Sequence, residues 1–114
     1  MSLAPDIIAK ISNIKRCGRN NIQEITRIFE NINSKVRWII EKILVDGARL
    51  PETESRELQL LLSIQTKLRR LSIEPGSGNT DAHLYNNECH RAVHLEQTIK
   101  EIERRYKFKI LDEH

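Results

Sequence analysis

The sequence predicts an all-α fold, an antiparallel helical bundle of one short and three long helices at about 6–17, 21–46, 52–72 and 81–107. Apolar residues recur at the three- and four-residue spacing of a helix with one buried face, most clearly over 22–44. They are mainly Ile and Leu, whereas strands draw on Val, Thr and aromatic residues. A chain of 114 residues suffices for one core, so we expect residues 1–114 to form a single domain.

The two N-terminal helices are separated by a turn that contains glycine. Asp6 can cap the short helix, and Gly18 ends it because glycine enters the left-handed conformation without a Cβ clash. Asn20 or Asn21 can cap the long second helix, which closes at 46–47. Connections this short predict that successive long helices pack antiparallel.

The third helix shows charge at both ends that matches the helix dipole. Pro51 suits its first turn, where the missing N–H has no helical partner to lose. Acidic residues occupy the opening turns and basic residues the final turns: Glu52, Glu54, Glu57, then Lys67, Arg69, Arg70. The following segment 74–80 contains Pro and two Gly, which predicts a flexible connector.

The fourth helix carries a seven-residue repeat. Tyr85, Ala92, Ile99 and Tyr106 are each seven residues apart. This spacing fits a coiled-coil seam and also ordinary packing within a bundle, and we favour bundle packing. The apolar tail over 108–114 either prolongs this helix or folds back, and the pattern leaves both open.

Composition points to a soluble, intracellular protein. No apolar run reaches the length of a membrane span, and the N-terminus lacks a basic-then-apolar signal pattern. Cys17 and Cys89 show no metal-binding or redox spacing, so we expect reduced thiols. The net charge of +3 is too mild to define a partner by itself.

Histidines on the fourth helix form the sharpest candidate for chemistry. His90 and His94 are four residues apart and share a face, with His83 and Cys89 nearby as further ligands. Cys89 is adjacent to His90 and points about 100° away from it. We therefore expect solvated or capping histidines, no metal and no cofactor. No catalytic motif occurs either, so we predict a protein that is not an enzyme.

Nucleic-acid binding is the alternative function that the basic residues suggest. Lys and Arg cluster on the first and third helices: Lys10, Lys15, Arg16, Arg19, Lys67, Arg69, Arg70. Phosphate backbones attract such clusters. However, the few aromatic residues fall at core spacing and supply no platform on which bases could stack.

The favoured function is protein–protein interaction, either with a helical partner protein or by self-association. Trp38 lies off the apolar stripe of the second helix, and exposed Trp, Tyr and Arg dominate binding hot spots. We predict that the partner-binding residues are Arg37, Trp38 and Glu41 on the second helix, with Tyr85 and Tyr106 on the fourth. The alternative is that Trp38 packs beneath the first helix or the tail.

Overall fold

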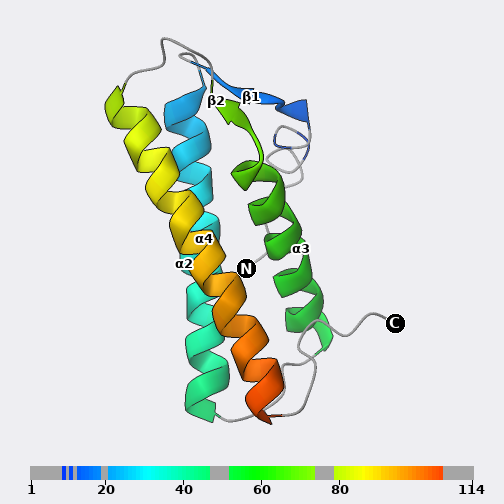
Figure 1. Cartoon of the computed structure of the whole chain (residues 1–114). Helices are drawn as coiled ribbons and strands as arrows, with labels where there is room; N and C mark the ends of the chain where they lie inside the picture. The colour runs from blue at the N-terminus through cyan, green and yellow to red at the C-terminus, as the bar shows by residue number, and fades with distance from the viewer. Residues whose placement is uncertain are drawn as a thin grey trace.

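The computed structural model describes residues 9, 11, 13–18, 21–46, 52–73 and 79–106. In chain order, its elements are strand β1 (Arg16–Cys17), helix α2 (Ile22–Asp46), helix α3 (Glu52–Arg69), strand β2 (Ser72–Ile73) and helix α4 (Asn79–Tyr106) (Figure 1). The described part of the chain is therefore a compact all-α arrangement of three helices, not the four that the sequence predicted.

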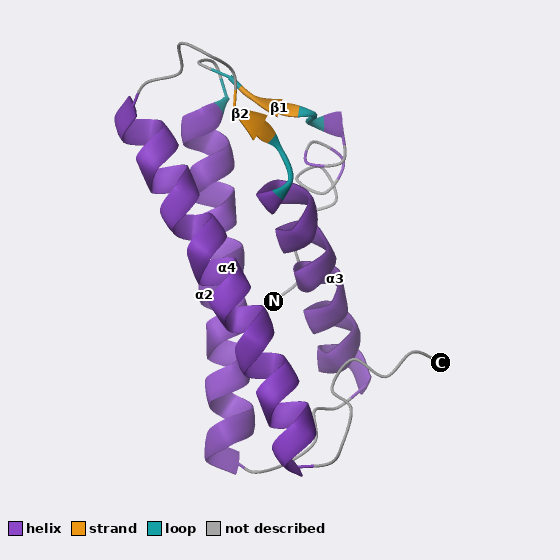
Figure 2. Ribbon diagram, in the orientation of Figure 1, coloured by secondary structure: helices purple, strands orange, loops and turns teal. Residues whose placement is uncertain are grey.

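The three helices lie side by side with their axes roughly aligned. Along the chain, α2 and α4 run in the same direction and α3 runs in the opposite one (Figure 1). Helix α4 packs more extensively on α2 than on α3. The two short strands pair in parallel at one end of the bundle, with Arg16 opposite Ser72 and Cys17 opposite Ile73 (Figure 2).

The predicted short helix over 6–17 is wrong at its end. Arg16 and Cys17 form β1, so this segment of the chain leaves helical geometry before the predicted boundary. Ala9, Ile11 and Asn13 have helical backbone, and the other residues of 6–12 lie outside the described ones. The change to strand at residue 16 follows from a tertiary contact, the pairing with β2.

The third helix is shorter than predicted, ending at Arg69 rather than near 72. The N–H groups of Arg70 and Leu71 donate to carbonyls three residues back, at 3.2 and 3.4 Å. Such bonds tighten a last helical turn. Ser72 then enters β2, so pairing with β1 takes over from helical hydrogen bonding.

The bounds of the two long helices agree with the prediction to within two residues. At the start of α2, the Asn21 carbonyl accepts the Ile25 N–H at 2.9 Å, which makes Asn21 the N-cap. Its side-chain oxygen accepts the Gly18 N–H at 2.7 Å and so fixes the entering chain. The connector residues 74–78 and the tail 108–114 lie outside the described residues.

The core is aliphatic and draws on all three helices. Helix α2 contributes the largest share, as its periodicity predicted: Ile22, Ile25, Phe29, Ile32, Val36, Ile39, Ile40, Ile43. Leu58, Leu61 and Leu68 of α3 meet these residues, as do Tyr85, Ala92 and Ile99 of α4. The heptad positions 85, 92 and 99 are therefore buried inside the bundle. None of the described helices combines the length and apolarity needed to cross a membrane.

A buried polar junction links the three helices near their middle. Asn33 of α2 is fully buried and its amide donates to the backbone carbonyl of Glu88 at 3.0 Å and to the Glu88 carboxylate at 2.9 Å. The Gln65 amide of α3 donates to the Asn33 side-chain oxygen at 2.6 Å. Arg91 holds the same Glu88 oxygen at 2.9 Å. Because these partners lie on three different helices, the junction fixes the position of each helix along its axis relative to the other two.

A second polar anchor lies at the end of the bundle near the strands. The Tyr85 hydroxyl donates to the Leu68 carbonyl at the last turn of α3. Its ring packs on Phe29 of α2 with centroids 5.9 Å apart and a tilt of 60°, a favourable aromatic geometry. One side chain of α4 therefore contacts both other helices.

Candidate partner-binding surface

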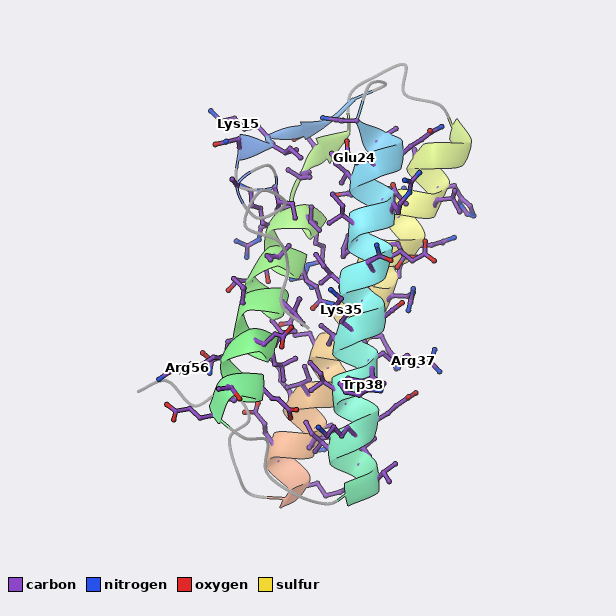
Figure 3. All side chains as sticks on the ribbon, turned by 180° about the vertical axis from the view of Figure 1, so that it is seen from behind. Lys15, Glu24, Lys35, Arg37, Trp38 and Arg56 are labelled. Atoms are coloured by element: carbon purple, nitrogen blue, oxygen red, sulfur yellow. The ribbon has the colours of Figure 1, made fainter. Side chains whose placement is uncertain are left out.

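The side of α2 that faces away from the core exposes apolar side chains. Trp38 is 59% exposed and Val45, seven residues later, is 83% exposed. Seven residues are close to two helical turns, so both side chains point outward along one line. Figure 3 shows Trp38 on the outer side of α2, with Arg37 beside it at the edge of the helix. We call Arg37, Trp38, Glu41 and Val45 the α2 outer face.

Charged side chains lie on both sides of Trp38 along the helix. The Lys42 ammonium lies 5.5 Å from the centre of the indole ring, within the range of a cation–π contact. The same ammonium binds the Glu54 carboxylate of α3 at 2.9 Å. On the other edge, the Arg37 Nε donates to Glu41 at 3.1 Å. The indole is therefore flanked by fixed polar groups while its own surface stays open.

A groove between α2 and α4 continues the α2 outer face. It has a volume of ≈ 590 Å³, and Arg37 and Glu41 form its α2 edge. Its α4 edge carries His90, Arg91 and His94, and Ile40 and Leu95 make the apolar floor. The structure therefore brings two of the predicted α2 residues, Arg37 and Glu41, next to the exposed side of α4.

A second depression, of ≈ 410 Å³, extends this surface toward the far end of α4. Leu44 lines it together with His94 and Ile102. The periodicity of the sequence placed Leu44 in the buried stripe, but the side chain is 46% exposed. The reason is that Leu44 lies at the flank of the stripe, where α4 only partly covers it.

The two tyrosines predicted for this surface are placed differently from the α2 residues. Tyr85 is 2% exposed, and its hydroxyl is bonded to the α3 backbone. We therefore leave Tyr85 out of the surface. Tyr106 is the last residue of α4, and its side chain is not among those described. Within the described residues, the surface consists of Arg37, Trp38 and Glu41 with Leu44, Val45 and the α4 edge.

The histidines of α4 are exposed, as expected for solvated side chains. His83, His90 and His94 all face solvent. Among the residues that the structure describes, no three His, Cys, Asp or Glu side chains are grouped so that they could hold a metal ion. Cys89 is half-buried, and burial raises the pKa of its thiol. The side chain of Cys17 is outside the described set.

A third groove lies between α3 and α4, and an ion-pair network is part of its lining. Its volume is ≈ 340 Å³. Arg69 of α3 donates to one Glu96 oxygen at 3.0 Å, and Lys100 contacts the other at 3.2 Å. Hydrogen bonds from Lys100 and Arg69 lower the pKa of the Glu96 carboxyl, against a smaller opposing effect of burial.

This lowered pKa predicts a pH dependence of stability. A carboxylate whose pKa is lower in the folded chain stabilises the fold above its unfolded pKa and loses that contribution as pH falls through the folded value. We expect Glu96→Gln to reduce stability at neutral pH, with the difference from wild type beginning to shrink near the ordinary glutamate pKa of about 4.3 and vanishing once the pH is below the lowered folded-state pKa. Urea unfolding at a series of pH values measures it. A difference that stays constant across the series would contradict the ion-pair assignment.

Within the described part of the chain, only some of the basic residues suggested for nucleic-acid binding are exposed charges. Arg69 is engaged with Glu96, whereas Arg70 is exposed. Lys15 is exposed beside β1, and Lys10 and Arg19 lie outside the described residues. Among the described residues, the clusters of the first and third segments therefore do not form a platform of free cations around an aromatic ring.

Sequence reasoning missed the polar junction and the exposure of Val45. A signal for the junction was present, because Asn33 interrupts the apolar stripe between Ile32 and Val36, and Gln65 does the same next to Ile64. A polar residue inside such a stripe must find a buried partner.

No protein-family model, no curated protein and no solved structure matches this chain.

Proposed function

We propose that this chain is a non-enzymatic protein–protein interaction module, an adaptor or complex subunit, that binds a helical partner through the α2 outer face and the adjoining α2–α4 groove. The observation that carries this proposal is the exposure of Trp38 on the side of α2 opposite the core. A Trp side chain gains far more by burial than most residues, about 150–250 Å² of contact area. Because the ring is exposed in this chain, a partner that covers it would add this buried contact area.

The surroundings of Trp38 have the composition of a binding site. Interface centres are rich in Trp and Arg, and they are ringed by polar groups that exclude water. Here Arg37, Glu41 and Lys42 surround the indole, and Val45 extends the apolar contact along the helix. A groove with an apolar floor between two helices accepts the apolar stripe of a third helix.

Photo-cross-linking in an extract of the native host tests this proposal. A benzoylphenylalanine at position 45 should give a discrete cross-linked product upon irradiation, because Val45 is 83% exposed beside Trp38. The matched control carries the same probe at exposed Arg56 on α3, which points away from α2 (Figure 3). The product should be absent at position 56 and should disappear when Trp38→Ala is combined with the probe at 45. Equal products at both positions, or none at 45, would overturn the proposal.

Trp38→Ala should separate binding from folding. The exposed side chain contributes little to the core, so we expect the free energy of unfolding to fall by less than about 1 kcal/mol, chiefly from the lost contact with Lys42. Hot-spot residues cost at least about 2 kcal/mol on truncation, so partner affinity should fall about thirtyfold. Urea unfolding and quantified cross-linking give the two numbers. A large loss of stability would show that Trp38 is structural.

The nucleic-acid alternative makes a different prediction. It requires binding that weakens steeply with added salt, because cations are released from the phosphate backbone. Mobility shift with single- and double-stranded probes at low salt decides it. Binding that depends on Lys67 and Arg70 but not on Trp38 would favour this alternative over the protein partner.

A further inference from the structure

The α2 outer face has a charge pattern that is complementary to itself. Arg37 and Glu41 carry opposite charges four residues apart on one edge of the stripe that contains Trp38. The bond between them uses the Arg37 Nε, one of the five N–H donors of a guanidinium. Each of the two side chains can therefore contact a second charged group of the opposite sign.

A two-fold axis perpendicular to α2 would use this pattern. In a two-fold interface, residue i of one copy contacts residue j of the other, and the reverse contact is made as well. With the axis at the level of Ile39, Arg37 comes level with Glu41 of the partner subunit, and Glu41 with the partner's Arg37. In antiparallel helices, residues on the same edge face one another, so both reciprocal pairs form on one side of the interface.

The same axis places Trp38 near the centre of the interface. Trp38 is one residue from the level of the axis, an offset of about 1.5 Å along the helix. The two indole rings would therefore meet across the interface. Val45 comes near the level of the small side chain at Ser34 of the partner subunit, where no bulky group stands in its way. An aromatic contact near the centre of the interface is typical of a binding hot spot.

The opposite edge of the stripe carries Lys35 and Lys42, which are seven residues apart. The axis at Ile39 brings Lys42 level with residue 36 of the partner subunit, beside the partner's Lys35, and the charge of Lys42 is offset by the Glu54 carboxylate at 2.9 Å. Helices α3 and α4 contact the core side of α2, through residues such as Phe29, Val36 and Ile40. They leave the side that carries Trp38 open to a second helix, as Figure 3 shows for Trp38 itself.

From this complementarity we infer that the partner on the α2 outer face is a second copy of this chain, bound antiparallel through α2 with reciprocal Arg37–Glu41 ion pairs. The inference rests on the proposed function, because it uses the same surface and names its occupant. The partner copy completes the site by supplying the second charge to each Arg37 and the second indole to each Trp38.

Charge-reversal variants test the inference by sedimentation velocity over a range of concentrations. Wild type should sediment as a dimer at high concentration. R37E places Glu opposite Glu, and E41R places Arg opposite Arg, so each variant alone should dimerise at least about tenfold more weakly. An equimolar mixture of R37E and E41R should form a heterodimer, because both cross-copy pairs then join opposite charges. The double variant R37E/E41R should dimerise again.

Folding and the proposed function are checked separately. Because Arg37 and Glu41 are exposed, both single variants should keep the wild-type unfolding midpoint at protein concentrations low enough that all three are monomeric, which circular dichroism measures. A wild type that is monomeric at every concentration, or a mixture no more dimeric than its components, would overturn the inference. If the photo-cross-linked product at position 45 then has a mass other than twice the chain, the proposed function stands and only self-association fails. If no product forms, both fail.

Discussion

Replacing Phe29 with alanine is expected to lower the free energy of unfolding by about 4 kcal/mol, since truncating a buried Phe removes its transfer energy and leaves a cavity. Phe29 is fully buried on α2 and packs on the ring of Tyr85 of α4. Few atoms nearby can move into the space, because Tyr85 is itself held by its bond to Leu68. Equilibrium urea unfolding measures the change.

The neighbouring position supplies the control for Phe29. Glu30 is exposed on the same helix, so Glu30→Ala should change the free energy of unfolding by no more than about 0.5 kcal/mol. The two variants share a helix and differ in burial. If Phe29→Ala were as stable as Glu30→Ala, the packing of α4 on α2 through this ring would be contradicted.

Asn33→Ala should lower the free energy of unfolding by about 3 kcal/mol, because each buried partner left without a hydrogen bond costs about 1–3 kcal/mol. The substitution removes the acceptor of the Gln65 amide and the donor to Glu88, on two different helices. It also leaves a small cavity at the centre of the bundle. Urea unfolding gives the magnitude.

A double variant separates lost hydrogen bonds from lost volume at this junction. Asn33→Leu combined with Gln65→Leu removes both members of the 2.6 Å bond and fills the space with apolar atoms. Exchanging both partners for apolar groups is often nearly neutral, so this variant should be more stable than Asn33→Ala. Equal destabilisation of the two variants would indicate that the cost comes from the hydrogen bonds to Glu88, which both variants remove, and not from the lost volume.

The long helices could be predicted from the sequence because their signals are local. The apolar spacing over 22–44 fixes which side of α2 is buried, and Asn21 and the residues after 46 mark its ends. The same holds for the buried positions 85, 92 and 99 of α4. Such signals lie within a few residues of the element that they specify, so no knowledge of distant contacts is needed.

The strands and the end of α3 could not be predicted in the same way. Arg16–Cys17 and Ser72–Ile73 are too short to show an alternating pattern, and each is a strand only because the other lies beside it. The sequence also predicted Tyr85 as a partner contact, although a core position and a partner contact use the same seven-residue spacing. Its bond to Leu68, on another helix, is what places it in the core.

The candidate surface could be predicted from the sequence only in part. Trp38 lies outside the apolar stripe of α2, which predicted exposure, and Arg37 and Glu41 are its neighbours on the helix. The groove beside them depends on how closely α4 approaches α2, as does the exposure of Leu44. The sequence of one helix alone therefore predicts neither the groove nor the exposure of Leu44.

The role of the α2 outer face can be measured directly through its indole. The chain contains one Trp, so replacing it with fluorotryptophan gives one fluorine NMR resonance that reports on Trp38 alone. We predict that this resonance shifts or broadens as the protein is concentrated and again in an extract of the native host, because a partner covers the exposed ring. A sharp resonance at one unchanged position, dilute, concentrated and in extract, would contradict a partner-binding role for Trp38.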